Sequence, residues 1–219
     1  MRLAARFNGP PGSANGGITC GRLASYVGAA AVEVTLRRPP PLDADLRVDA
    51  SGGSARLYDG ELLVAEAVPT ELDLEVPEPV TAERAREAEA TYGGLVAHPF
   101  PTCFSCGTER TDGLGLRPGM VGEGRAACTW TPADEDPVLV WAALDCPGGW
   151  ATDLPGRPMV LGRMALRQPG RVLPGRPHVL SAWITGKDGR KTHTGTALHD
   201  PDGVLVAVAR STWIAISEP

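Results

Sequence analysis

The sequence predicts an α+β fold in which each of two similar halves sets one helix against an antiparallel sheet. Three features occur twice and in the same order: a helix-like stretch of small residues, a Leu-Arg-x-Pro segment, and a hairpin with an Asp and a Gly in its turn. In the first half they lie at 16–28, 36–39 and 57–67, and in the second half at 137–151, 166–169 and 198–209. The shared order indicates a tandem duplication. Two coincidental hairpins in an all-β chain remain the alternative.

The first half is predicted to span residues 1–80. A helix begins near Gly16-Gly17, and Asp59-Gly60 is typical of a hairpin turn. The strands are expected at 32–37, 45–50, 55–58 and 62–68. Residues 81–97 form a linker, in which 81–90 is rich in helix formers with little apolar content and predicts a solvated helix.

The second half is predicted to span 98–219. Its first strand places Ala126, Cys128 and Trp130 on one face, and a helix follows from about Asp136. Hairpin turns at 188–189 and 202–203 separate the later strands, which are expected at 159–167, 179–185, 191–198 and 204–216. Such a sheet has one apolar face and buries it by wrapping around the helix.

Composition bounds the function. Of the 219 residues, 42% are hydrophobic, which is enough for a core, and the net charge of −5 argues against general nucleic-acid binding. No stretch approaches the roughly 20 apolar residues of a membrane helix, and the first residues lack the apolar core of a signal peptide. The five cysteines are an odd count that suits a reducing compartment, so we expect a cytoplasmic protein.

Short motifs carry a resemblance to a known fold. Cys-Phe-Ser-Cys-Gly at 103–107 is followed by Gly-Leu-Gly-Leu at 113–116, Trp-Ala-Ala-Leu-Asp lies at 141–145, and Asn-Gly-Gly lies at 15–17. Together these resemble the hotdog fold of acyl-CoA thioesterases in its tandem, or double hotdog, form, with a long central helix in each half. Arg-Thr at 110–111 and Asn15 replace the Asn-Pro and the His that are common there.

The resemblance implies a composite site between the halves. A helix start polarises the thioester carbonyl, and a carboxylate about eight residues after the first Gly acts from the other half. Counting from Gly16-Gly17 this acidic position falls at Ala24, and counting back from Asp145 the donor position falls at Pro137, which has no N–H. We therefore expect one live site made of Gly16 or Gly17 with Asp145, beside Asn15. Alternatively, Asp145 caps the helix end and Gly16-Gly17 is only a tight turn.

Other residues are weaker candidates. Arg163, Arg167, Arg190 and Lys191 are expected to meet the phosphates of coenzyme A, and His193 to line a cleft. Coenzyme A enters only as part of the substrate, and no other cofactor is expected. Cys103-x-x-Cys106 lacks a second ligand pair, and only Cys128 and Cys146 remain in that half. We therefore expect reduced thiols in a buried turn and no metal.

The preferred function is hydrolysis of a small-molecule acyl-CoA thioester, with Asp145 either attacking directly or activating water. The incomplete motifs keep open a second class, an acyl-CoA or lipid-binding module without turnover. A dehydratase or hydratase is a weaker reading because it needs a His paired with an acid. No Walker, dinucleotide or G-x-S-x-G motif is present. The state of assembly, monomer or homodimer, stays open, and no nucleic acid or membrane span is expected.

Overall fold

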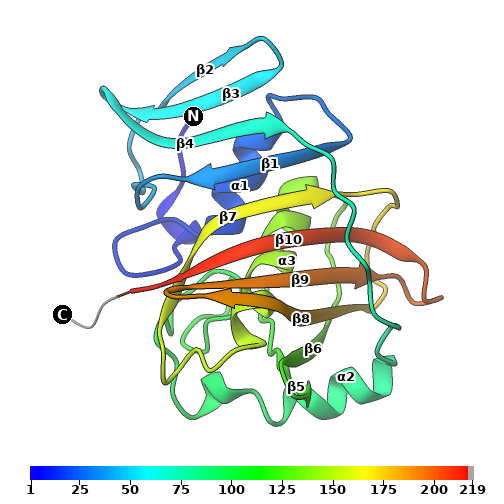
Figure 1. Cartoon of the computed structure of the whole chain (residues 1–219). Coiled ribbons are helices and arrows are strands. Elements are labelled where there is room, and N and C mark those ends of the chain that lie inside the picture. Colours follow the sequence, from blue (N-terminus) through cyan, green and yellow to red (C-terminus); the bar gives the residue numbers. More distant parts are fainter. Residues whose placement is uncertain (217–219) are drawn as a thin grey trace.

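A computed structural model describes residues 1–216, and within this range ten strands form one antiparallel sheet (Figure 1). The strands lie in the order β2-β3-β4-β1-β7-β10-β9-β8-β6-β5. Helices α1 (Gly16–Ala24) and α3 (Pro137–Trp150) lie against one side of this sheet, here called its inner face, and pack on each other. The predicted α+β class is therefore confirmed. Residues 217–219 of the predicted C-terminal half lie outside the described residues.

The first strands follow the predicted order and lie close to the predicted positions. Gly60 has a φ of +55°, which fits the turn that joins two of them. They are β1 (Ala31–Leu36), β2 (Arg47–Ser51), β3 (Ser54–Asp59) and β4 (Leu62–Pro69). Helix α1 is shorter than the expected long helix, because it ends at Ala24 and the chain turns at Gly28 with a φ of +69°. A 3-10 turn, Ala5–Phe7, precedes it.

The later strands also follow the prediction, with one addition. Gly189 and Gly203 have positive φ at the expected hairpins. The strands are β6 (Arg125–Trp130), β7 (Met159–Arg167), β8 (His178–Asp188), β9 (Lys191–His199) and β10 (Leu205–Ala215), and β5 (Gly119–Gly122) was not predicted. Gly148 and Gly149 lie inside α3, where the lack of side chains allows α3 to approach Trp213.

The N-terminal and C-terminal halves of the chain share one sheet and one main core. Strand β1 pairs antiparallel with β7, with Val34 opposite Met164. The main cluster of buried apolar side chains takes members from both ends, including Ile18, Leu57 and Leu198. The interior is therefore shared rather than divided, and α1 and α3 meet within it.

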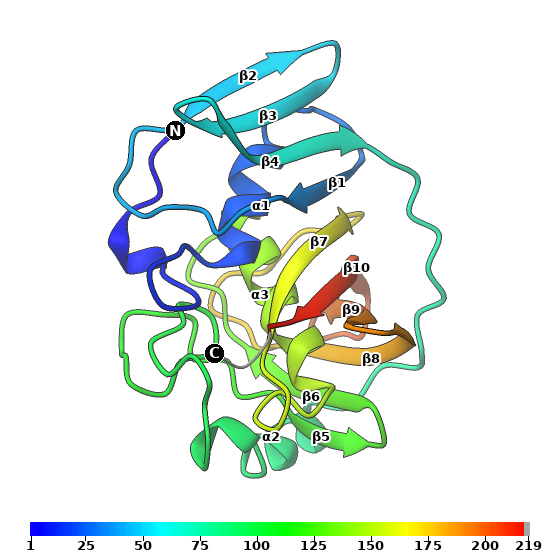
Figure 2. The ribbon, with the colours of Figure 1, turned by 60° about the vertical axis from the view of Figure 1, so that its left-hand side comes forward.

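The connection between β4 and α2 (Ala82–Glu89) runs over the outer face of the sheet (Figure 2). Leu72 is buried there among residues of three strands, Ala31, Ala165 and Val208. Helix α2 buries Ala85 against β6 and β8. The expected solvated helix is thus amphipathic, because it covers apolar positions that the strands turn outward.

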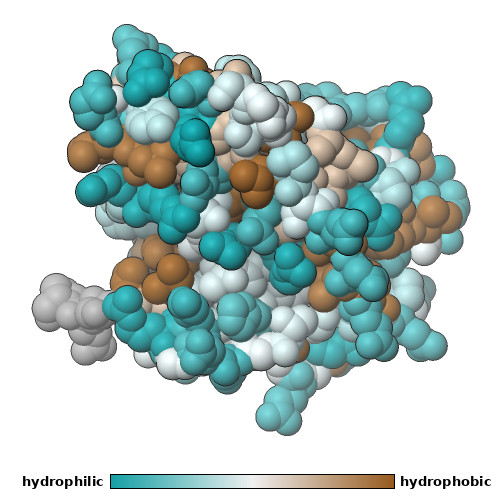
Figure 3. Space-filling model, turned by 45° about the horizontal axis from the view of Figure 1, so that its top comes forward, coloured by the Kyte–Doolittle hydropathy of each residue, from teal (hydrophilic) through white to brown (hydrophobic). Residues whose placement is uncertain are grey.

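The surface seen in Figure 3 is mainly hydrophilic, with apolar side chains in separate patches. Exposed large apolar residues are scattered over several elements, Tyr26, Leu62, Val68, Leu95, Val96, Met120, Val204 and Ile216. Scattered apolar residues are normal on a protein surface. In the described chain, no helix combines the length and apolar character that crossing a membrane would require.

Candidate active site

The start of α1 touches the middle of α3 at Gly17. A Cβ atom at this position would lie 2.6 Å from the Trp141 carbonyl oxygen and 2.7 Å from the Ala142 Cα. Only glycine permits this approach, because both atoms belong to backbone. The Gly17 N–H donates to Asp145 Oδ2 at 2.8 Å. Two residues 128 positions apart in the sequence therefore form a direct contact.

Gly16 and Gly17 have different partners. The Gly17 N–H is taken by Asp145, and the Ile18 N–H donates to Asn15 Oδ1 at 2.9 Å. Within residues 1–216 the Gly16 N–H has no protein acceptor, and Gly16 lines the adjacent cavity. The first N–H groups of a helix carry partial positive charge. Gly17 thus orients the carboxylate, whereas the Gly16 N–H is without a partner in the described chain.

Asp145 is a buried acid with one free oxygen. Its exposure is only 2%, and within the described chain its Oδ1 atom has no hydrogen-bond partner. Burial raises the pKa of this carboxyl to about 7, although the hydrogen bond from Gly17 opposes the rise. A carboxyl with this pKa exchanges protons near neutrality, as a general base does. The alternative that Asp145 caps a helix end does not fit, because α3 continues to Trp150.

A cavity of about 480 Å³ lies beside this pair. Asp145, Gly16 and Asn15 are among its polar lining residues. The remaining wall is largely apolar and includes side chains from α3, β7 and β10, namely Trp150, Met159, Leu161, Trp213 and Ile214. An apolar wall with a few convergent polar groups is the usual form of a small-molecule site.

Asn15 links the two helices to the loop that contains Cys103. Its side-chain amide donates to Ser105 Oγ at 3.3 Å and to Cys103 Sγ at 3.7 Å. Ser105 in turn donates to the Ala142 carbonyl oxygen at 2.9 Å. Asn15 therefore caps α1 and fixes the loop.

The predicted coenzyme A contacts lie elsewhere. None of Arg163, Arg167, Arg190, Lys191 and His193 lines the cavity. On β7 and β9 the alternate residues point inward, as Met164 and Thr196 do, so Arg163, Arg167, Lys191 and His193 face outward. Arg163 pairs with Glu33, and His193 hydrogen-bonds Thr212.

The cavity instead has Arg37 and Arg38 at its edge. Arg37 pairs with Glu66, and Arg38 is exposed beside it. Both belong to the Leu-Arg-Arg-Pro segment that the sequence indicated only as a repeat. The prolines that follow could have indicated that these two arginines lie at an edge, because prolines take the chain out of the sheet at this point.

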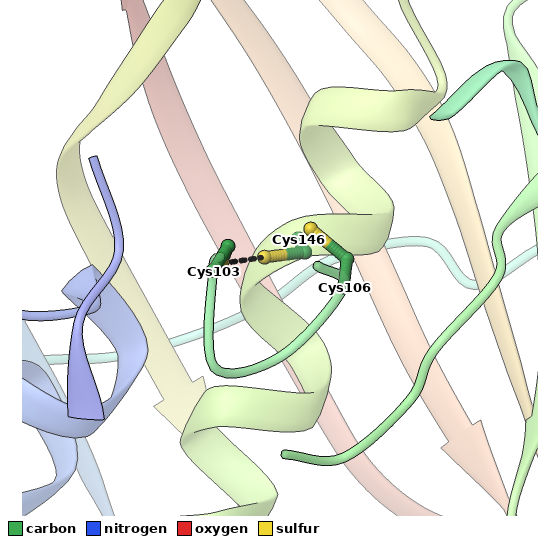
Figure 4. Close-up of side chains that lie close together, drawn as sticks. All are labelled: Cys103, Cys106 and Cys146. Carbon is green, nitrogen blue, oxygen red and sulfur yellow. Dashed lines mark hydrogen bonds between the residues drawn. The ribbon is translucent and has the colours of Figure 1, made fainter. Parts of the chain in front are cut away.

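Three cysteine side chains lie close together in the structure (Figure 4). Asn15 donates a hydrogen bond to one of them, Cys103. Cys103 and Cys106 lie on one loop and Cys146 on α3, and Cys103 Sγ is 3.7 Å from Cys146 Sγ. All three are buried, unbridged and in the wall of the cavity. Hydrogen bonds from the Cys106 and Cys146 thiols lower the pKa of Cys103, whereas burial raises the pKa of Cys106. The sequence identified Cys146 only as a remaining cysteine and gave no reason to place it beside Cys103 and Cys106.

Solved structures share this architecture. A conserved protein of unknown function with a hotdog fold from Alicyclobacillus acidocaldarius superposes with a TM-score of 0.67 at 12% identity, covering 100% of this chain and 92% of its own. The TesB protein of Mycobacterium avium subsp. paratuberculosis gives 0.62 at 14%, covering 99% and 91%. A protein from Novosphingobium aromaticivorans provisionally named a thioesterase gives 0.61 at 17%, covering 95% and 91%. The chain therefore has a hotdog fold.

Comparisons of sequence add nothing to this: no family model matches the chain, and no curated protein matches it significantly.

Proposed function

We propose that this chain hydrolyses an acyl-CoA thioester at one composite site between two hotdog units. The first unit comprises residues 1–80 and the second 98–219, joined by 81–97. The contact between Gly17 and Asp145 carries the proposal, because it sets a helix start from one unit against an acid from the other. Two of the similar solved structures, which match nearly the whole chain, are named as a thioesterase or as TesB, and they support this proposal.

The proposed chemistry uses the two unoccupied polar atoms. The thioester carbonyl oxygen accepts from the Gly16 N–H, which stabilises the negative charge that develops when the carbonyl is attacked. Asp145 Oδ1 removes a proton from the water that attacks the carbonyl carbon. The C–S bond then breaks, the acyl group leaves as a carboxylic acid, and the thiolate of coenzyme A takes the proton from Asp145 to leave as the thiol. The reciprocal pair is inert, since Ala24 has no acid and Pro137 has no N–H.

The cavity suggests how the substrate lies. The apolar wall around Trp150, Met159 and Trp213 suits an acyl chain. Arg37 and Arg38 replace the outward-facing cations as candidates for the phosphates of coenzyme A, because they border the same cavity. The proposed substrate is therefore an acyl-CoA whose tail is buried and whose nucleotide stays near the two arginines.

The test is release of free thiol from a panel of acyl-CoAs. Asp145→Asn keeps the shape of the side chain and removes the base, so turnover should fall by about 10²–10⁴-fold. Asp188→Asn, at an exposed hairpin, is the matched control and should leave turnover unchanged. Equal turnover in the two variants excludes Asp145 from the reaction.

One observation favours the second function, an acyl-CoA-binding module. The Gly17 N–H, one of the two expected oxyanion donors, is already occupied by Asp145. Saturable binding of acyl-CoA without any thiol release would establish this function instead. For a dehydratase the cavity lacks a partner for Asp145, because no histidine of the described chain lines it.

A further inference from the structure

The three-cysteine cluster brings thiols from two distant segments to one point. Cys103 and Cys106 come from the loop before β5, and Cys146 comes from α3 (Figure 4). Their sulfur atoms all lie within 4.8 Å of one another, and each side chain is buried. Buried cysteines are common in cores, but three converging sulfurs in the wall of a cavity form a set of soft ligands.

The distance between two of the sulfurs, those of Cys103 and Cys146, fits a shared metal ion better than a disulfide. Zinc–thiolate bonds of about 2.3 Å in a tetrahedron separate neighbouring sulfurs by about 3.8 Å. Cys103 Sγ and Cys146 Sγ are 3.7 Å apart. A disulfide needs a sulfur–sulfur distance of about 2.05 Å, so these two atoms would have to move toward each other.

N–H donors point at the sulfurs. The Trp150 indole N–H donates to Cys106 Sγ at 3.4 Å, and the Asn15 amide donates to Cys103 Sγ at 3.7 Å. Such donors offset the negative charge of metal-bound thiolates and orient them.

The loop is also held rigid before any ligand arrives. A Cβ at Gly107 would lie 2.6 Å from the backbone N and O atoms of Cys103, so the turn closes tightly and tolerates only glycine. Ser105 ties the loop to the Ala142 carbonyl oxygen of α3. The two ligands of the loop are thus fixed relative to the third on the helix.

We propose that Cys103, Cys106 and Cys146 bind one zinc ion as thiolates, with its fourth position open to the cavity. In residues 1–216 no His, Asp or Glu side chain joins the three sulfurs, so water or a ligand in the cavity completes the tetrahedron. On binding, each thiol releases its proton to solvent and the Zn–S₃ unit carries one net negative charge. This departs from the expectation of no metal, which considered only spacing along the sequence.

The direct test is metal content, which does not depend on thioester hydrolysis. The chain is produced with zinc in the medium, and zinc is measured by inductively coupled plasma mass spectrometry. We expect about one zinc per chain in the wild type and almost none in Cys103→Ser and Cys146→Ser. Cys128→Ser removes a buried cysteine outside the cluster and should keep the metal.

Two further measurements keep the proposal testable if a ligand variant does not fold. Cobalt titration of the apo wild-type chain should give a thiolate-to-cobalt charge-transfer band. Trp150→Phe removes one N–H donor while retaining an aromatic ring, and should weaken zinc binding by about tenfold.

Three outcomes would overturn the site. They are a zinc-free wild type that also gives no cobalt band, zinc retained in full by Cys146→Ser, or an intact mass two hydrogens lower that shows a disulfide. Loss of zinc with unchanged thiol release would leave the metal site standing and separate it from the proposed hydrolysis. Zinc binding without any thiol release would support the metal site and contradict the proposed hydrolysis.

Discussion

At the scale of single residues, Gly17 determines how closely the two helices approach. Replacing it with alanine places a methyl group 2.6–2.7 Å from backbone atoms of Trp141 and Ala142, which cannot turn aside. We expect Gly17→Ala to lower the free energy of unfolding by about 1–3 kcal/mol, as overpacking does. Urea unfolding measures the change. Gly122→Ala, where no atom lies within 4 Å of the added Cβ, is the control, and equal midpoints would contradict the close crossing.

His199 gives a second prediction at this scale. It is buried on β9, and burial lowers its pKa. The unfolded chain therefore binds the proton more tightly, so stability is complete above the unfolded pKa of about 6.5 and falls as the pH drops through it. Asp145, whose pKa is raised, changes stability in the opposite direction over this range, so the prediction concerns the difference between two proteins. On acidification the melting temperature of the wild type should fall relative to that of His199→Gln. Thermal melts across this pH range test the prediction. Parallel curves of melting temperature against pH for the two proteins would show that His199 does not cause the pH dependence.

At the scale of elements, α3 lies on the sheet through glycines. A Cβ at Gly148 would lie 2.6 Å from Thr194 Oγ1 and 3.0 Å from Trp213 Nε1. Alanine gains about 1 kcal/mol in helix propensity over glycine, whereas overpacking costs about 1–3 kcal/mol. Packing should therefore win, and Gly148→Ala should lower the melting temperature. A higher melting temperature, read by circular dichroism, would show that α3 has room to move.

The same element shows what a sequence reveals and what it does not. Signals such as Asp59-Gly60 identified which neighbouring strands are joined by hairpins, because turn chemistry is local. The role of Gly148-Gly149 inside α3 could not be read from the sequence, because their contact with Trp213 depends on packing across more than 60 residues. Strand β5 escaped prediction, because Gly-Met-Val-Gly has no alternation long enough to read.

The candidate site likewise has a part that the sequence could predict and a part that it could not. The spacing between the glycine pair and the acid in the family that the sequence resembles indicated Gly16-Gly17 and Asp145 as site residues. The structure brings these residues together. The spacing could not separate the two glycines, because their roles depend on which N–H faces the carboxylate. The outward direction of Arg163 and the approach of Cys146 to Cys103 follow from tertiary placement alone.

At the scale of the whole molecule, the two proposed hotdog units share a sheet across β1 and β7 and one main core. Neither unit closes its apolar interior without the other, so both should unfold together. The tryptophans provide a way to see this, because all five lie in the second unit, Trp130, Trp141, Trp150, Trp183 and Trp213. Their fluorescence reports one unit, while far-ultraviolet circular dichroism reports both.

A core substitution in the first unit tests this coupling. Leu57 on β3 is fully buried and lies in the shared core, so Leu57→Ala should cost about 2–5 kcal/mol. If the units unfold together, the tryptophan fluorescence midpoint in urea shifts as far as the circular dichroism midpoint, although no tryptophan lies in the altered unit. A fluorescence curve that keeps the wild-type midpoint while the circular dichroism splits into two steps would show independent units. The contact between Gly17 and Asp145 would then join two separately stable bodies, and the composite site would need another source of rigidity.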